Sequence, residues 1–140
     1  MKRSPCQGVT LLELMVAVAI VGILTAIAWP SYAEYLRRGY RATATSALLE
    51  AQQFMERYYA ANDGYATGSP LAYPDLPARL QQVPPDAPRY RLSLGETASA
   101  SSYTLIASPI AADRCGDLSL SSTGIKGASG AGVTAADCWK

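Results

Sequence analysis

One carboxylate stands inside the most apolar stretch of the chain. Residues 9–29 read VTLLELMVAVAIVGILTAIAW, and Glu13 is the only ionisable side chain among them. A carboxylate in a membrane segment costs a few kcal/mol even on the lenient insertion scales, so it is a functional candidate by default. The chemistry that Glu13 offers is charge pairing with a positive group.

The sequence shows no arrangement of residues for catalysis. There is no histidine, the commonest general base and metal ligand. Asp113 and Asp117 bracket Cys115, but an oxygen-ligand metal site needs more convergent groups, so solvation or turn capping is the expected role. The glycine-rich residues 127–132 do not show the pattern of a loop that follows a strand and opens a helix, so no phosphate-binding loop is implied there. We therefore predict a protein without enzymatic activity or cofactor.

The cysteines favour a structural disulfide. Cys6 lies near the start of the chain, whereas Cys115 and Cys138 are expected to pair in an oxidising compartment. Their bridge would close a loop of about two dozen residues and contribute about 3 kcal/mol in the chain-entropy model. A redox-active pair is the alternative, but the spacing is far from the two-residue kind.

Length and charge limit the possibilities further. The chain has 140 residues, enough for one domain and an anchor, and its formal net charge is +1. A product that begins at Val9 would carry 10 basic and 11 acidic residues, a net charge of −1. Such a balance gives no field for strong nonspecific attraction to nucleic acid.

The apolar run is long enough to cross a membrane. Its 21 residues are close to the roughly 20 that span about 30 Å of hydrocarbon as a helix. Lys2 and Arg3 precede it and should remain cytoplasmic, which places the residues after Trp29 outside the cytoplasm. Two alternatives are a secretory signal peptide cleaved at residues 26–28 (Ala-Ile-Ala) and a plain single-pass anchor, in which Glu13 has no purpose.

Residues 8–16, GVTLLELMV, resemble the class III signal of type IV prepilins and pseudopilins. The resemblance implies that an inner-membrane prepilin peptidase cuts between Gly8 and Val9 and N-methylates Val9. Val9 departs from the phenylalanine most common at this position in the family. Gly22 and Pro30 stand where pilin helices have their helix-weakening glycine and proline.

The resemblance also implies a partner for Glu13, the α-amino group of Val9 in its own chain or in a neighbouring subunit. That amine has a reference pKa near 7.7–8.0 and is mostly cationic at pH 7. A paired arrangement offsets much of the cost of burying either charge alone. A subunit in the wrong register would leave both charges unpaired, so Glu13 would set the register of assembly. The alternative is a glutamate that merely reaches the membrane interface.

Beyond Pro30 the hydrophobic spacing predicts an amphipathic helix over residues 30–61, with a kink or interruption at Pro30. The turn residues 62–64 (Asn-Asp-Gly) should end it. Arg37, Arg38 and Arg41 are expected to form a solvated collar near the lipid headgroups, with DNA contact as a weaker alternative.

The second half of the chain predicts a small antiparallel sheet. Residues 62–88 are proline-rich and read as a connector, with one short helical turn at Leu76 and Leu80 and packing contacts from Tyr65 and Tyr73. Alternating patterns predict strands at 89–94, 102–108 and 117–121, and a fourth short strand is expected to start at 125–126. The expected fold is α+β, a long N-terminal helix packed on an antiparallel sheet, with a C-terminal disulfide-bounded loop.

Residues 115–139 resemble the C-terminal region of minor pilins of the PilE type. Together the two resemblances imply a structural subunit of a type IV pilus, most similar to a minor pilin, that serves adhesion, motility or DNA uptake. Its implied partners are other pilin subunits, the prepilin peptidase, the assembly platform and the inner membrane, which it would span once with its C-terminus in the periplasm before joining an extracellular pilus. The alternatives are a pseudopilin of a type II secretion system and a periplasmic protein with a signal peptide.

The implied segments are a leader at 1–8, a filament-core helix half at 9–29, an amphipathic half at 30–61, a connector at 62–88 and a sheet region at 89–140.

Overall fold

The computed structural model describes residues 10–140, which form three helices and five strands. It comprises two compact units, one that ends at Leu36 and one that spans residues 37–140. The elements are α1 (Leu11–Asn62), α2 (Ala78–Gln81), β1 (Gln82–Val83), β2 (Tyr90–Leu94), β3 (Thr104–Pro109), β4 (Leu118–Ser121), β5 (Lys126–Ala128) and α3 (Ala135–Cys138).

The first unit contains the apolar part of α1. Its large hydrophobic side chains are exposed on every side of the helix, from Leu11 to Trp29. The most apolar 18-residue window has a mean hydropathy of 2.5, so the helix is long and apolar enough to cross a membrane. α1 runs without a break through Gly22 and Pro30, so the interruption expected at Pro30 is absent. The helix-weakening role of these two residues stays a prediction.

The second half of α1 belongs to the second unit and ends where the turn residues predict. Asp63 follows the last helical residue and adopts a positive φ of 57°, and its amide donates to the carbonyl oxygen of Tyr59 at 2.8 Å. The Asn62 side chain donates to the carbonyl of Tyr58. Aspartate and asparagine suit this position because their short polar side chains tolerate the left-handed conformation.

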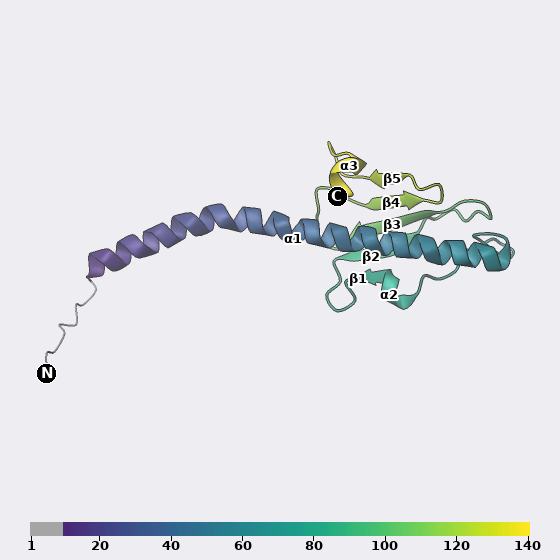
Figure 1. Ribbon diagram of the computed structural model, residues 1–140, viewed down its shortest axis with the longest axis horizontal. Helices are drawn as coiled ribbons and strands as arrows, with labels where there is room; N and C mark the ends of the chain where they lie inside the picture. Colours follow the sequence, from purple (N-terminus) through teal and green to yellow (C-terminus); the bar gives the residue numbers. More distant parts are fainter. Residues whose placement is uncertain (1–9) are drawn as a thin grey trace. The chain divides into compact units, whose positions relative to one another are not determined.

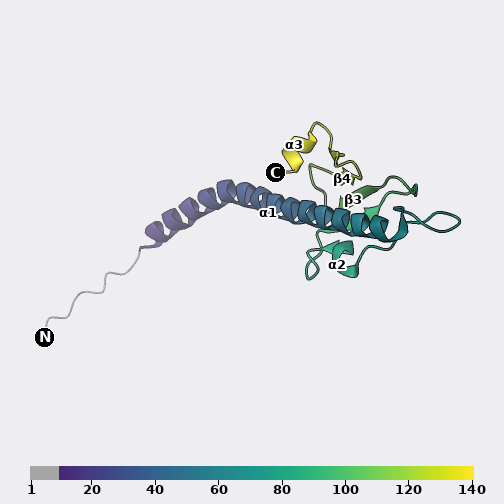
Figure 2. The same cartoon turned by 45° about the vertical axis from the view of Figure 1, so that its right-hand side comes forward.

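The sheet of the second unit is antiparallel throughout, in the order β1-β2-β3-β4-β5. The central register places Leu92 opposite Ala107 and Leu105 opposite Leu120. In Figure 1, α1 lies against the sheet, with α2 beside β1 and α3 beside β5, and Figure 2 again shows α2 and α3 on opposite sides of α1. The four predicted strands are confirmed, whereas β1 and α3 lacked a recognised signal.

The hydrophobic core lies between one stripe of α1 and one face of the sheet. The small residues Ala44, Ala47 and Ala51 are buried on the helix side of this core. Alternation along the strands turns every second side chain toward them. The largest fully buried side chains are Leu48, Met55, Leu105, Leu118, Leu120, Cys115 and Cys138.

Two tyrosines fasten the connector to the domain, as the sequence predicts. The Tyr73 hydroxyl donates to the carbonyl oxygens of Thr97 and Ser102 at 2.9 and 2.8 Å. The Tyr65 ring packs edge-on against Tyr103, with ring centroids 4.7 Å apart. These contacts hold a proline-rich segment that has little secondary structure of its own.

Candidate assembly determinants and the Arg41–Asp113 centre

Glu13 lies in the first turn of α1, where its backbone amide donates to the hydroxyl of Thr10 at 3.2 Å. A threonine followed three residues later by a glutamate is the sequence signature of a capping box. A negative charge in the first turn also stabilises the helix dipole. The predicted partner, the amine of Val9, and the predicted cleavage site at Gly8 lie outside the described residues.

Arg41 and Asp113 form the most buried ion pair described in the second unit. The Nη2 atom of Arg41 lies 2.9 Å from Oδ2 of Asp113, and its Nε donates to Oδ1 at 2.9 Å. The exposed fractions of the two side chains are 3% and 7%. Two parallel N–H···O bonds give an arginine–carboxylate pair both strength and a fixed orientation.

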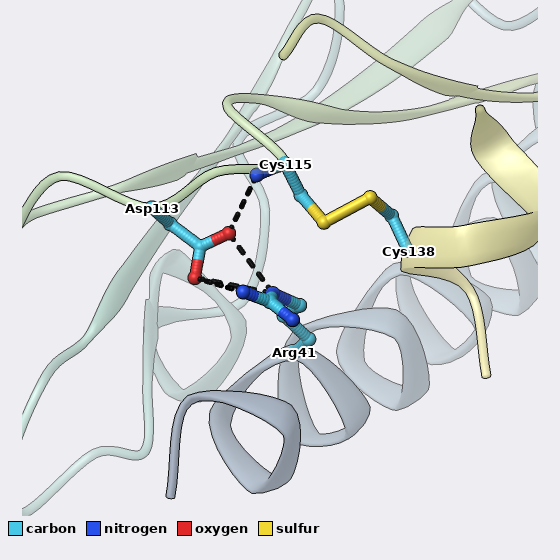
Figure 3. Close-up of polar contacts among 4 residues, drawn as sticks. All are labelled: Arg41, Asp113, Cys115 and Cys138. Carbon is cyan, nitrogen blue, oxygen red and sulfur yellow. Dashed lines mark hydrogen bonds and ion pairs between the residues drawn. A yellow bond between two sulfur atoms is a disulfide. The ribbon is translucent and has the colours of Figure 1, made fainter. Parts of the chain in front are cut away.

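The same carboxylate orients the backbone next to the disulfide. Asp113 Oδ1 also accepts the amide of Cys115 at 2.8 Å, and Cys115 is bonded to Cys138 of α3 (Figure 3). The disulfide predicted from the cysteine count is thereby confirmed. α1, the β3–β4 loop and the C-terminal helix meet at this cluster, which we call the Arg41–Asp113 centre.

The electrostatics of the centre favour an ionised Asp113. Burial by itself raises the pKa of this carboxyl, but the hydrogen bonds from Arg41 and the Cys115 amide, together with the Arg41 charge, outweigh it and lower the pKa. Burial and the negative charge of Asp113 raise the pKa of the neighbouring Tyr90 to about 12. The Tyr90 hydroxyl is buried and has no hydrogen-bond partner within residues 10–140.

The two aspartates that bracket Cys115 are not brought together as a metal site. Asp113 is engaged by Arg41, whereas Asp117 is exposed and its backbone amide donates to the Ser129 hydroxyl. Within the described part of the chain, no group of three or more histidine, cysteine, aspartate or glutamate residues is placed to hold a metal ion. Turn capping, the expected role, is what Asp113 performs at Cys115.

The glycine-rich loop after β5 is held by close backbone contacts. The Gly130 amide donates to the Cys115 carbonyl, and a Cβ at Gly130 would collide with the carbonyl oxygen of Arg114. Trp139 donates from its indole to the carbonyl of Gly127 at 2.9 Å. The disulfide and these contacts together restrain a segment that has few apolar side chains.

The structure corrects the expectation for one of the three arginines. Arg37 and Arg38 are exposed as predicted, but Arg41 is buried and paired rather than part of a solvated collar. The signal that could have revealed this is helical spacing, because Arg41 precedes Ala44 and Leu48 at three- and seven-residue steps on the buried stripe. Nothing in the sequence identified Asp113 as its partner, 72 positions away.

Comparison with known proteins places the fold in a family. Residues 30–119, well over half of the chain, match the family model described as type IV minor pilin ComP, DNA uptake sequence receptor. The chain belongs to this type IV minor pilin family. Residues 3–29 match the model of the prokaryotic N-terminal methylation motif. The prepilin resemblance drawn from Glu13 and its neighbours is thus confirmed, and the apolar helix is consistent with membrane anchoring before assembly.

Individual relatives are also pilins. The minor pilin is 39% identical over 59 residues to the fimbrial protein EcpC of Eikenella corrodens, a match that covers 42% of this chain and 39% of that one. It is 43% identical over 58 residues to the type IV major pilin protein PilE of Neisseria gonorrhoeae, covering 41% and 34% of the two chains. These matches therefore span only about two fifths or less of the relatives' length.

A solved structure shares the fold. The non-core minor pilin PilV of Neisseria meningitidis superposes with a TM-score of 0.54 at 24% identity, covering 72% of this chain and 94% of that one. The predicted architecture, a long apolar helix packed on a small antiparallel sheet with a C-terminal disulfide, is confirmed. Pilin family proteins are structural subunits that assemble with one another into filaments.

Proposed function

We propose that this minor pilin is a structural subunit of a type IV pilus and carries out no catalysis itself. A prepilin peptidase cleaves it between Gly8 and Val9 and methylates the new amino terminus. Before assembly it spans the inner membrane once, with residues 37–140 in the periplasm, and an assembly platform transfers it into the extracellular filament. Adhesion, motility and DNA uptake are the uses open to such a filament.

The observation that carries this proposal is the succession of two family matches along one chain. The methylation motif occupies residues 3–29 and the minor pilin model occupies residues 30–119. A secretory signal peptide cleaved at residues 26–28 would remove nearly all of the first match. The apolar helix surface from Leu11 to Trp29, on which every residue is exposed, supports the proposal as well, because such a surface requires lipid or neighbouring subunits to cover it.

Within this function, Glu13 pairs with the methylated amine of Val9 and sets the register of assembly. Support comes from its position, since it is the only ionisable residue between Val9 and Trp29. In an apolar filament core, an unpaired charge on either group is strongly unfavourable. The hydrogen bond from the Glu13 amide to the Thr10 hydroxyl caps the first helical turn, and this fixes the position of the Glu13 backbone at the start of the helix.

Intact mass spectrometry of protein recovered from sheared surface fibres tests the proposal. The expected mass is that of residues 9–140, from which two hydrogens are lost at the disulfide and to which one methyl group is added. A chain that still contains residues 1–8 in normal fibres contradicts the proposed processing. A chain that begins at Trp29 supports the periplasmic alternative instead.

DNA capture is a second candidate function, favoured by the family match itself, whose description names a DNA uptake sequence receptor. The outward face of the sheet adds little positive charge, because Arg91 is its only cation among the described strand residues that point away from α1. The test is a binding titration of the full chain in a nonionic detergent against labelled duplex DNA at several salt concentrations. Binding that prefers one duplex sequence over a shuffled one supports capture, and equal weak binding to both argues against it.

A further inference from the structure

Two surface pockets of the second unit flank the Arg41–Asp113 centre, and both are rich in arginine. The larger pocket, of about 250 Å³, is lined by Arg38, Arg41, Arg114, Asp137, Cys138 and Lys140. The smaller, of about 150 Å³, is lined by Arg37, Tyr40, Arg89, Tyr90, Pro109, Ala111, Ala112 and Asp113. The exposed cations of the two pockets form a surface that we call the basic end, and these are Arg37, Arg38, Arg89, Arg114 and Lys140.

The basic end carries a clear excess of positive charge. Six basic and two acidic residues line the two pockets. The buried Arg41 and Asp113 neutralise each other, and Asp137 lies 3.8 Å from the Lys140 amine. Glu34 and Asp86 are near in sequence and reduce the excess without reversing it. Several of the arginines also contact neighbouring residues, so the net charge of the surface, not the freedom of any one side chain, is what attracts an anion.

The cations of the basic end are far apart in the sequence, and the tertiary structure brings them together. Arg37 and Arg38 come from α1, Arg89 precedes β2 and Arg114 lies in the β3–β4 loop. Lys140 is brought alongside them by the Cys115–Cys138 disulfide. The Arg89 guanidinium is stacked over the ring of Tyr40, 5.0 Å from its centroid, which holds that cation in place.

The position of the basic end in the sequence indicates which kind of anion it binds. Arg37 follows the last residue of the apolar run, Trp29, by only eight positions in the sequence. Trp29 ends the apolar run, and Tyr32 and Tyr35 follow it before the first arginine; all three are exposed, and aromatic residues of this kind are typical of the membrane interface. The attraction of an anionic membrane surface extends over about one Debye length, or about 8–10 Å. The first arginine of the basic end is thus close in sequence to the segment expected to span the membrane.

We propose that the basic end binds the phosphate groups of anionic phospholipids while the subunit is anchored in the membrane. The proposal rests on the proposed membrane-anchored stage that precedes assembly. Arginine and lysine form charge-assisted hydrogen bonds with phosphate oxygens, and the exposed cations around the larger pocket, Arg38, Arg114 and Lys140, supply the positive charge that favours an anionic headgroup there. Such contacts hold the domain at the headgroups until extraction into the filament breaks them.

Lipid is favoured over nucleic acid because of where the cations gather. Among the described strand residues that point away from α1, Arg91 is the only cation, whereas the basic end carries five exposed cations and begins only eight positions after the apolar run. Anionic lipid is present at the basic end for as long as the subunit is anchored. DNA is nonetheless included as an outcome of the test.

The test is native mass spectrometry of the full chain, extracted in a nonionic detergent and supplied with equal amounts of phosphatidylglycerol and phosphatidylcholine. We expect several-fold more phosphatidylglycerol than phosphatidylcholine to remain bound. The triple variant Arg38→Gln, Arg114→Gln, Lys140→Gln should lose that preference. The matched control, Arg57→Gln, Arg79→Gln, Arg91→Gln, removes the same charge from exposed positions elsewhere and should retain it. Should the first triple variant fold poorly, the double variant Arg38→Gln, Lys140→Gln should show about half of the loss.

Separate arms identify the source of the phosphate. Inorganic phosphate added at the lipid concentration should not displace the bound lipid, because the lipid tails share the detergent micelle with the apolar helix. Equal retention of both lipids, or equal loss in both triple variants, overturns the proposal. Duplex DNA that binds the wild type and is lost only in the basic-end variant, with no lipid preference, assigns the surface to nucleic acid instead. Cleavage after Gly8 does not affect the lipid measurements. The intact mass therefore tests the proposed function separately, and lipid binding tests this proposal.

Discussion

Arg41 and Asp113 connect the long helix to the C-terminal half of the sheet through a pair of charges with almost no exposure to solvent. They are 72 positions apart, and the distance between Arg41 Nη2 and Asp113 Oδ2 is 2.9 Å. Asp113 also accepts the amide of Cys115, so the carboxylate joins the helix to the disulfide. A charged pair in this place gives α1 and the β3–β4 loop one well-defined alignment, since a shift of either leaves both charges buried and unpaired.

Arg41→Met should strongly destabilise the second unit. Removing one partner of a buried pair typically costs about 3–5 kcal/mol because the other charge remains buried. Arg38→Met is the matched control, since it removes an exposed arginine one turn earlier and should change the free energy of unfolding by about 0.5 kcal/mol or less. The measurement is urea unfolding of the full chain in a nonionic detergent, followed by near-ultraviolet circular dichroism.

A second variant separates the contribution of the charge pair to stability from that of side-chain packing. The double substitution Arg41→Met, Asp113→Leu removes both charges and should recover much of the stability lost in Arg41→Met, because an apolar pair avoids the desolvation of two ions. Equal destabilisation in the single and double variants would show that the pair contributes mainly through shape.

Acid should weaken the Arg41–Asp113 centre. The folded-state pKa of Asp113 lies below the ordinary value of 3.8, so its contribution to stability is fully present above that value. The contribution is lost as pH falls through the folded pKa, because the unfolded chain then binds the proton first. The difference in unfolding free energy between the wild type and Asp113→Asn should therefore be constant near pH 7 and shrink below about pH 4. A difference that is unchanged at low pH would contradict this account.

Local patterns in the sequence predicted most of the fold. The helix from the apolar run to Asn62, the strand alternation and the disulfide each follow from periodicity, turn chemistry or the cysteine count. β1 was missed because two residues, Gln82 and Val83, are too short to show alternation, and they are a strand only through pairing with β2. Arg41 was misassigned because its charge suggested solvent, whereas its helical position placed it on the buried stripe. The basic end could not be predicted, since four separate segments contribute to it.

Loss of the disulfide should release the C-terminal segment. The double substitution Cys115→Ser, Cys138→Ser opens a link with a sequence separation of 23, which should cost about 3 kcal/mol of unfolding free energy. Hydrogen exchange should rise first at the amides of Gly130 and Trp139, because their acceptors lie within or beside the closed loop. Exchange that rises equally throughout β2 and β3 would show that the link stabilises the whole unit and not chiefly this segment.

Gly130 is expected to tolerate no side chain. A methyl group there would collide with the backbone carbonyl of Arg114, which no rotamer change can relieve, so Gly130→Ala should cost about 1–3 kcal/mol. Gly39→Ala is the matched control, because its Cβ would meet no atom and it lies within α1, where alanine is favoured by about 1 kcal/mol. The midpoint of thermal unfolding should therefore fall in Gly130→Ala and rise in Gly39→Ala. A neutral Gly130→Ala would mean that the loop moves aside easily.

Glu13→Gln separates the two roles available to this residue. Glutamine at the third helical position can still complete a capping box with Thr10, but it has no charge to offer the amine of Val9. If charge pairing sets the register of assembly, Glu13→Gln should be processed after Gly8 yet be recovered in sheared fibres at about one tenth of the wild-type level or less, since pairing worth about 1.4 kcal/mol already changes an equilibrium tenfold. Thr10→Ala is the complementary control, because it removes the cap and retains the charge, and it should be incorporated nearly as well as the wild type. Normal incorporation of Glu13→Gln together with poor incorporation of Thr10→Ala would assign Glu13 to the helix cap and end the pairing hypothesis, while leaving membership of the pilin family unaffected.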